Sequence, residues 1–256
     1  MIDTHSHIYA EEFDSDIAEV IARAKAAGIT KIILPNVDSE SLPRMLQLES
    51  EHPAYCFAAI GLHPTSVKEN FFKELEIVKK ELERREYIAI GEIGIDLYWD
   101  KSFLKEQIHV FAQQIEWALE YNLPVIIHVR DSFRETMQVL EQFRGKGLKG
   151  VFHSFTGTID QAMEIIEFGG FYIGINGIVT FKNSGLDAVV LQIDAQYLLL
   201  ETDALYLTFA PFRGKRNESE YLTLVATKLA NTLNMNFNQL TKITTENAYK
   251  LFKKLI

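Results

Sequence analysis

The sequence predicts an α/β protein, a (β/α)8 TIM barrel, because three observations agree. Short apolar, strand-like runs alternate with amphipathic helical patterns through most of the 256 residues. Eight strand–helix pairs in about 250 residues are what this barrel requires. Runs such as Lys31-Ile-Ile-Leu and Val125-Ile-Ile are nearly continuous in apolar residues, which is typical of strands buried on both faces. A doubly wound open sheet is the alternative, and the strand count favours the barrel.

Taken in order, the elements form one repeating series, without a linker, a low-complexity segment or an internal sequence repeat. One domain over residues 1–256 is therefore expected. Gly28 and Gly147 stand where a helix should stop before a strand resumes. We expect strands at 2–7, 30–36, 54–62, 87–93, 124–129, 150–155, 170–176 and 197–203, with helices over 16–27, 71–85, 103–121, 131–143, 160–168, 186–193, 218–233 and 238–254.

Composition places the chain among ordinary globular proteins, with 47% hydrophobic and 24% charged residues. No apolar run approaches the roughly 18 residues of a membrane span, and no signal-peptide pattern opens the chain. A cytoplasmic protein that does not bind membranes is expected. The single Cys56 cannot form an internal disulfide, and its apolar setting predicts a core residue in a reducing compartment.

The formal net charge of −9 argues against a protein that binds nucleic acid through a broad basic surface. It does not exclude a nuclease that works through metal ions in a cleft. Bound divalent cations can be the largest local charges in such a site and reverse its sign.

Metal-competent side chains fall repeatedly at the predicted carboxyl ends of strands, where barrel enzymes place their functional groups. In a strand, His5 and His7 would point to the same face, about 7 Å apart. Any one of these residues could be an ordinary hydrogen-bonded strand end, but together they favour a metal site. The predicted ligands are His5, His7, Glu92, His128, His153 and Asp203.

Four imidazoles and two carboxylates exceed the three protein ligands of a usual mononuclear catalytic site. They suit a two-metal site with ions about 3.5–4 Å apart, bridged by Glu92. Mixed nitrogen and oxygen donors admit Mg²⁺, Mn²⁺ or Zn²⁺.

These residues sit in motifs that resemble the TatD-type metal-dependent deoxyribonucleases, within the amidohydrolase-like barrel hydrolases. The resemblance runs in order through essentially the whole chain. Ser154 and Leu205 depart from the family's usual Cys and Pro, and neither position supplies a ligand. The matching motifs are Asp3-Thr-His-Ser-His, Gly61-Leu-His-Pro, Gly91-Glu-Ile-Gly-Ile-Asp, Ile127-His-Val-Arg-Asp, His153-Ser-Phe-Thr-Gly, Glu201-Thr-Asp, Pro211-Phe-Arg-Gly-Lys-Arg-Asn and Thr245-Glu-Asn-Ala-Tyr-Lys-Leu-Phe.

The resemblance implies a DNase, and specifically an exonuclease that processes single-stranded ends in DNA repair or degradation. It also implies how two ions would be shared. His5, His7, Glu92 and Asp203 would hold one ion, and Glu92 would bridge to a second ion held by His128 and His153.

Further roles follow from chemistry and position. Asp203 and Glu92 are the predicted catalytic carboxylates, with Asp203 also able to accept a proton from water. Glu201 is predicted either to assist it or to accept a hydrogen bond from a metal-bound histidine. The predicted substrate contacts are His63 (from the resemblance), Arg130, Arg213 and Lys215, and Tyr98 and Trp99 could stack on a base or simply pack.

Two other functions remain open at this stage. One is a hydrolase of a small ester, lactone or phosphoester on the same barrel. Such enzymes often bridge their metals with a carboxylated lysine where this chain has Glu92. The other is a non-catalytic metal-binding barrel, which would have no need of six ligand residues. DNA is the predicted partner, with no obligatory protein partner and a monomer expected.

Overall fold

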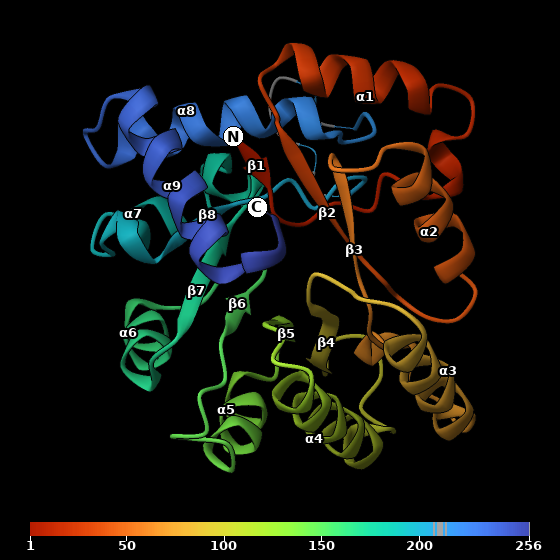
Figure 1. The fold of residues 1–256 in the computed structure, drawn as a ribbon. Helices are drawn as coiled ribbons and strands as arrows, with labels where there is room; N and C mark the ends of the chain where they lie inside the picture. The colour runs from red at the N-terminus through yellow and green to blue at the C-terminus, as the bar shows by residue number, and fades with distance from the viewer. Residues whose placement is uncertain (207, 209–211, 213, 256) are drawn as a thin grey trace.

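The computed structural model describes residues 1–206, 208, 212 and 214–255, and within them eight parallel strands form a ring with helices outside it (Figure 1). Backbone pairing orders the strands as β1-β2-β3 and β4-β5-β6-β7-β8. The strands are β1 (Ile2–Asp3), β2 (Lys31–Pro35), β3 (Cys56–Ala59), β4 (Ile90–Asp96), β5 (Val125–Arg130), β6 (Gly150–Phe152), β7 (Phe171–Ile175) and β8 (Leu198–Leu200).

Two isolated parallel bridges join these sheets at both edges. Ile60, just after β3, bridges to Ile90 at the start of β4. Ser6 bridges to Ala204, which connects the segment after β1 with the segment after β8. The ring is therefore continuous, and the predicted (β/α)8 barrel is confirmed.

The helices cover the outside of the ring through one apolar stripe each. In α3, the buried Phe71, Leu75, Val78 and Leu82 recur every three or four residues and face the strands. The helices are α1 (Ile17–Ala26), α2 (Leu42–Glu51), α3 (Phe71–Arg84), α4 (Leu104–Glu120), α5 (Phe133–Glu141), α6 (Ile159–Phe168), α7 (Leu186–Val190), α8 (Leu222–Thr232) and α9 (Phe237–Leu251).

The end of the barrel where the strands begin is filled by apolar side chains. Phe252, just after α9, is fully buried there with Leu255. They pack in one cluster with Ile2, the first residue of β1, and with Ile88 and Ala89, which directly precede β4. Polar groups therefore gather at the opposite end, where the strands finish.

Strand four departs from its predicted limits, and two glycines explain its shape. It begins at Ile90, so Glu92 is its third residue and not its last. A Cβ at Gly91 would collide with Ile126, and one at Gly94 with the backbone carbonyl of His128. Only glycine lets β4 and β5 approach this closely. The β4–β5 register shifts between Ile90 and Ile93, around Glu92.

Other elements also differ from the sequence-based expectations: β3, β6, β8 and α7 are shorter, and three more differ in other ways. Strand one is only Ile2–Asp3, so His5 and His7 lie in the loop that follows it. Helix α2 was not predicted, although Pro43 in its first turn is a recognised start signal. The expected helix at 218–233 begins as a 3-10 turn, Ser219–Tyr221, before α8.

Cys56 is buried and not in a disulfide, as expected. Within the described part of the chain, no helix combines the length and apolarity that a membrane span requires.

Candidate functional site

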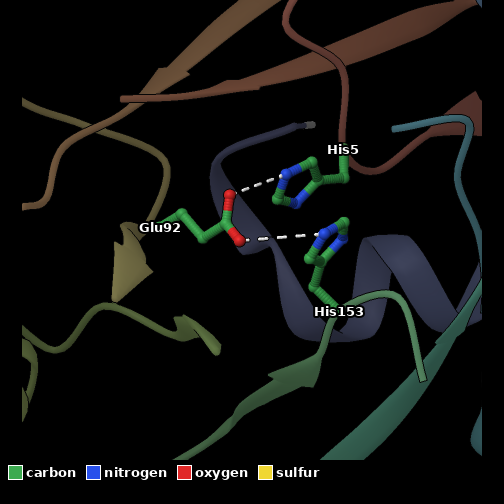
Figure 2. Close-up of side chains that lie close together, drawn as sticks. All are labelled: His5, Glu92 and His153. Carbon is green, nitrogen blue, oxygen red and sulfur yellow. Dashed lines mark ion pairs between the residues drawn. The ribbon is translucent and has the colours of Figure 1, made fainter. Parts of the chain in front are cut away.

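The six predicted ligands converge at the end of the barrel where the strands finish. All are buried except His128, which is partly exposed. Figure 2 shows three of them, from β4 and from the loops after β1 and β6, with their side chains pointing at one another. His5 and His7 follow β1, Glu92 lies in β4, His128 in β5, His153 follows β6 and Asp203 follows β8.

Glu92 occupies the centre, and its two carboxylate oxygens face different partners. Oε2 lies 3.1 Å from Nε2 of His5 and 3.6 Å from Nε2 of His7. Oε1 lies 2.8 Å from Nδ1 of His128 and 3.7 Å from Nε2 of His153. Figure 2 marks the pairs with His5 and His153. One carboxylate thus connects two sets of imidazoles.

Asp203 closes the group from the last strand. Its Oδ1 lies 3.9 Å from Nε2 of both His5 and His7, and its Oδ2 lies 3.7 Å from Nε2 of His153. The residue itself adopts a left-handed backbone conformation, with φ of 56°. Such conformations in residues other than glycine concentrate at functional sites.

His63 also belongs to this group. Its Nε2 lies 3.4 Å from Oε1 of Glu92, and its ring is 4.5 Å from that of His128. The resemblance assigned it to substrate phosphate, whereas its position makes it a candidate metal ligand as well.

The donor set fits divalent metal ions. Nε2 of His5 and Nε2 of His7 are 3.1 Å apart, near the separation of about 3.3 Å that two nitrogens have around a tetrahedral zinc. Three overlapping groups have their ligand atoms all within 4.8 Å of one another. They are His5, Glu92 and His153; His5, His7 and Asp203; and His63, Glu92 and His128.

Neighbouring side chains orient two of the imidazoles, those of His7 and His153. Nδ1 of His7 lies 2.8 Å from the hydroxyl oxygen of Tyr9, and that hydroxyl donates to the carbonyl of Pro35. Nδ1 of His153 lies 3.0 Å from Oε1 of Glu201. In both cases Nε2 is left to face the cluster, as in metal sites whose histidines are fixed by an outer partner.

Glu201 therefore faces His153, one of the predicted ligands, and the role predicted for it as an acceptor stays a prediction. Its Oε1 also accepts a hydrogen bond from the backbone N–H of Ser154 at 2.6 Å. A Cβ at Gly174 in β7 would collide with the Glu201 carboxylate, so glycine is needed there to make room for it.

Asp96 is a site residue that the sequence analysis missed. Its Oδ2 lies 2.8 Å from Nε2 of His128, and the residue is buried at the end of β4. It closes the run Gly91-Glu-Ile-Gly-Ile-Asp, and a carboxylate at a strand end in that motif was a signal available from the sequence. Tyr9 was missed too, because a tyrosine two residues after His7 has no distinguishing pattern.

Charges inside the cluster are strongly coupled. Burial would raise the pKa of Glu92, but His5, His63 and His153 outweigh burial and hold it well below its usual value. Burial lowers the pKa of His5 to well below its usual value. Glu92 is therefore an anion and His5 a neutral donor, which is the state that binds cations.

In two other histidines, neighbouring carboxylates outweigh burial and raise the pKa. Burial disfavours the charged form of His153, but the carboxylates of Glu201, Glu92 and Asp203 raise its pKa to about 10. For His128, hydrogen bonds with Asp96 and Glu92 likewise outweigh burial and raise the pKa. Burial raises the pKa of Asp203 to about 6.

The predicted substrate contacts lie in different places relative to the cluster. Arg130 ends β5, two residues after His128, and its side chain is exposed. Lys215 is exposed and lines a shallow depression of about 720 Å³ whose described lining includes none of the six predicted ligands. Its neighbour Arg216 forms an ion pair with Asp16 at 2.7 Å. The Arg216 charge therefore holds the loop after β8 against the segment before α1. Arg213 lies outside the described residues.

Comparison with known proteins identifies this architecture. A family model described as TatD related DNase matches residues 2–253. The chain belongs to the TatD-related DNase family. The predicted family and enzyme class, a metal-dependent hydrolase, are thereby confirmed.

Relatives of the TatD-related family match over nearly their whole length. The metal-dependent hydrolase YabD of Bacillus subtilis is 39% identical over 254 residues, 99% of each chain. A protein of Pantoea ananatis named 3'-5' ssDNA/RNA exonuclease TatD is 31% identical, over 98% of this chain and 99% of that one. The crystal structure of the TatD homologue YJJV of Escherichia coli superposes with a TM-score of 0.92 at 32% identity, covering 99% of this chain and 98% of that one.

Proposed function

We propose that this protein is a nuclease that hydrolyses phosphodiester bonds with two divalent metal ions, acting as an exonuclease on single-stranded DNA ends in repair or degradation. The proposal rests on the family membership and on the name of the Pantoea relative, a 3'-5' exonuclease of single-stranded DNA and RNA. A small ester, lactone or phosphoester is the alternative substrate.

The observation that supports it most directly is the position of Glu92. Its Oε2 faces His5 and His7, while its Oε1 faces His128 and His153. A carboxylate with one oxygen toward each of two donor groups is the arrangement that bridges a pair of metal ions. We assign His5, His7 and Asp203 to one side and His128 and His153 to the other, with His63 adjacent to the second.

Two divalent ions held there would supply Lewis-acid activation of water and of a phosphoryl oxygen. The protein's own groups would do the rest. With a pKa near 6, Asp203 is ionised at neutral pH and can accept a proton from the attacking water. Glu201 would keep the proton of a neutral His153 on Nδ1, so that the lone pair of Nε2 remains available to a metal ion.

Arg130 is the best-placed cation for the phosphate. It lies in the same strand as His128, and its guanidinium can offer two parallel N–H donors to phosphate oxygens. Lys215 would contact the strand farther from the reacting bond.

The test is a cleavage assay on end-labelled single-stranded DNA, run beside a panel of esters and lactones. The wild-type protein reconstituted with Mg²⁺, Mn²⁺ or Zn²⁺ should bind about two ions per chain and shorten the DNA, and chelation should stop it. Glu92→Gln should reduce the rate at least about 100-fold, because the bridging anion is lost.

The matched control is Glu86→Gln, a strongly exposed glutamate whose loss should leave cleavage unchanged. Circular dichroism would verify that both variants fold. Cleavage of an ester or lactone with no cleavage of DNA would overturn the substrate assignment, and a fully active Glu92→Gln protein would overturn the bridging role.

A further inference from the structure

Beside the cluster, Arg130, the cation proposed to bind the phosphate, forms a unit with two exposed aromatic side chains. The guanidinium of Arg130 lies 3.8 Å above the ring of Tyr98 and 5.4 Å from the centre of the Trp99 ring. The two aromatic rings meet edge to face, 4.9 Å apart at 88°. Tyr98 is 53% exposed and Trp99 is 70% exposed, although indole rings are usually mostly buried.

This exposure is unusual for the chain and is located near the site. Exposed large hydrophobic side chains are few among the described residues, and Trp99 is the most exposed of them. It follows β4, the strand that carries Glu92. A third exposed aromatic residue, Tyr206, lies three positions after Asp203 with its ring 6.1 Å from that of His7. Aromatic rings thus flank the cluster on two sides.

One carboxylate connects Tyr98 and Trp99 to the cluster. Oδ1 of Asp96 accepts hydrogen bonds from the backbone N–H groups of Tyr98 and Trp99, at 3.0 Å and 3.3 Å. Its other oxygen, Oδ2, lies 2.8 Å from Nε2 of His128. The rings are therefore held at a fixed place relative to a predicted metal ligand.

Arg130 is held by the same strands. It pairs with Asp96 in the β4–β5 register, and its carbonyl accepts a hydrogen bond from the N–H of Leu97 at 2.9 Å. In the part of the chain that the structure describes, no carboxylate lies within ion-pair distance of its guanidinium. In a protein of net charge −9, an arginine that stacks on tyrosine without an acidic partner is available for an anion.

We propose that Trp99, Tyr98 and Arg130 form a stacking site for one unpaired nucleobase and its adjacent phosphate, which selects a single strand. The proposal rests on the proposed nuclease function. The open face of Trp99 takes the base, and Arg130, held in place by Tyr98, takes the phosphate. Proteins that bind single strands without sequence preference combine an aromatic platform and a cation in this way.

The exposed face also explains the strand selectivity. A base inside a duplex is covered on both faces by its neighbours, so it cannot stack on Trp99 without leaving the helix. A base in a single strand needs no such unstacking, and every base has a face that the indole can cover.

The kinetic test compares an ordinary single strand with the same strand in which the bases near the cleaved end are replaced by abasic residues. The ratio of the two kcat/KM values should be about 10 or more for the wild-type protein, since one stacked base contributes that much. It should fall toward one in Trp99→Leu and remain high in Trp99→Phe, which keeps an aromatic face. Phe237→Ala removes an exposed aromatic ring at the start of α9 and should keep the wild-type ratio.

A binding test needs no turnover. The chain has two tryptophans, and Trp117 is 9% exposed, so a base that stacks on the protein should quench the fluorescence of Trp99. With chelator present, an oligothymidylate should quench the wild-type protein, an abasic strand should quench it far less, and Trp99→Phe should show no such response.

The two proposals can fail separately. Equal cleavage of ordinary and abasic strands by the wild-type protein would overturn the stacking site and leave the nuclease standing. If neither strand is cut, the nuclease assignment fails, and the quenching alone decides: equal responses to both strands, or none, would overturn the stacking site.

Discussion

The hydroxyl of Tyr9 selects the tautomer of a neutral His7. This hydroxyl donates to the carbonyl oxygen of Pro35 at 2.6 Å, and a carbonyl can only accept. The Tyr9 oxygen must then accept from His7, whose Nδ1 is 2.8 Å away and therefore carries the proton. In the neutral imidazole, Nε2 of His7 then carries the lone pair and faces His5 and Glu92.

Tyr9→Phe should accordingly weaken metal binding. Loss of an outer hydrogen-bond partner of a ligand histidine lowers metal affinity about 10- to 100-fold. The control is Tyr55→Phe, since the buried Tyr55 hydroxyl has no hydrogen-bond partner among the described residues. Isothermal titration calorimetry with Zn²⁺ or Mn²⁺ would measure both variants, and an unchanged affinity in Tyr9→Phe would count against the orienting role.

Asp96→Asn should change which nitrogen of His128 carries the proton, and it should leave the backbone hydrogen bonds of the loop after β4 intact. The amide oxygen of asparagine can still accept from Tyr98 and Trp99, but its NH2 group would replace the oxygen that faces Nε2 of His128. The imidazole would then place its proton on Nδ1, toward Glu92, where a metal ligand needs a lone pair. We expect metal affinity to fall about 10- to 100-fold.

Asp100→Asn is the matched control for Asp96→Asn. Asp100 lies in the same loop, but its side chain is exposed and pairs with Lys68 at 3.6 Å. Exposed pairs contribute little, so its metal affinity should equal that of the wild-type protein. Equal losses in the two variants would show that the loop's overall charge, and not the contact with His128, sets the affinity.

Metal binding should release protons. The raised pKa of His153, about 10, means that its imidazole is protonated at neutral pH before an ion binds, and the raised pKa of His128 favours its charged form. Each must lose a proton to become a ligand, so metal affinity should rise with pH as far as these pKa values. Calorimetry at pH 7 in two buffers of different ionisation enthalpy should give different binding enthalpies.

Glu201→Gln should reduce this release, because Glu201 is the carboxylate that raises the pKa of His153 most. Binding enthalpies that do not depend on the buffer would contradict the protonated state of His153.

Gly94→Ala should destabilise the fold more than Gly145→Ala. Both glycines have positive φ, 145° and 77°, so both substitutions strain the backbone, by about 1–2 kcal/mol for a left-handed residue. Only the Cβ at position 94 meets other atoms, those of the His128 backbone. Overpacking should add about 1–3 kcal/mol to the loss in the free energy of unfolding. Equal urea midpoints for the two variants would show that β4 and β5 can separate without cost.

Much of the barrel followed from sequence because its signals are local. Apolar runs such as that of β2 predict strands buried on both faces, and the stripe of α3 predicts a surface helix. The limits of β4 did not follow, because its bend at Gly91 and Gly94 depends on the approach of β5. Helix α2 was missed although its signal is also local, since Leu42, Met45 and Leu48 recur every three residues and are buried.

The cluster followed from sequence to a similar extent. Members of the cluster that lie in a recognisable motif, such as His128 and Asp203, could be named in advance as candidate ligands. The partners that orient them could not, because Tyr9 and Asp96 are ordinary residue types whose significance lies in contacts. Arg216 directly follows Lys215, a predicted substrate contact, yet its own partner is Asp16, which is distant in sequence.

The bridge between Ser6 and Ala204 has a consequence for how the protein is made. The two halves of that bridge are separated by nearly 200 positions, and His5 and Asp203 lie beside it. During synthesis, β1 leaves the ribosome long before β8 does, so its open edge must wait unpaired. The full set of imidazoles and carboxylates can therefore meet only after the barrel has closed. Binding of metal with native affinity would report completed folding, and a nascent chain lacking β8 should bind it weakly.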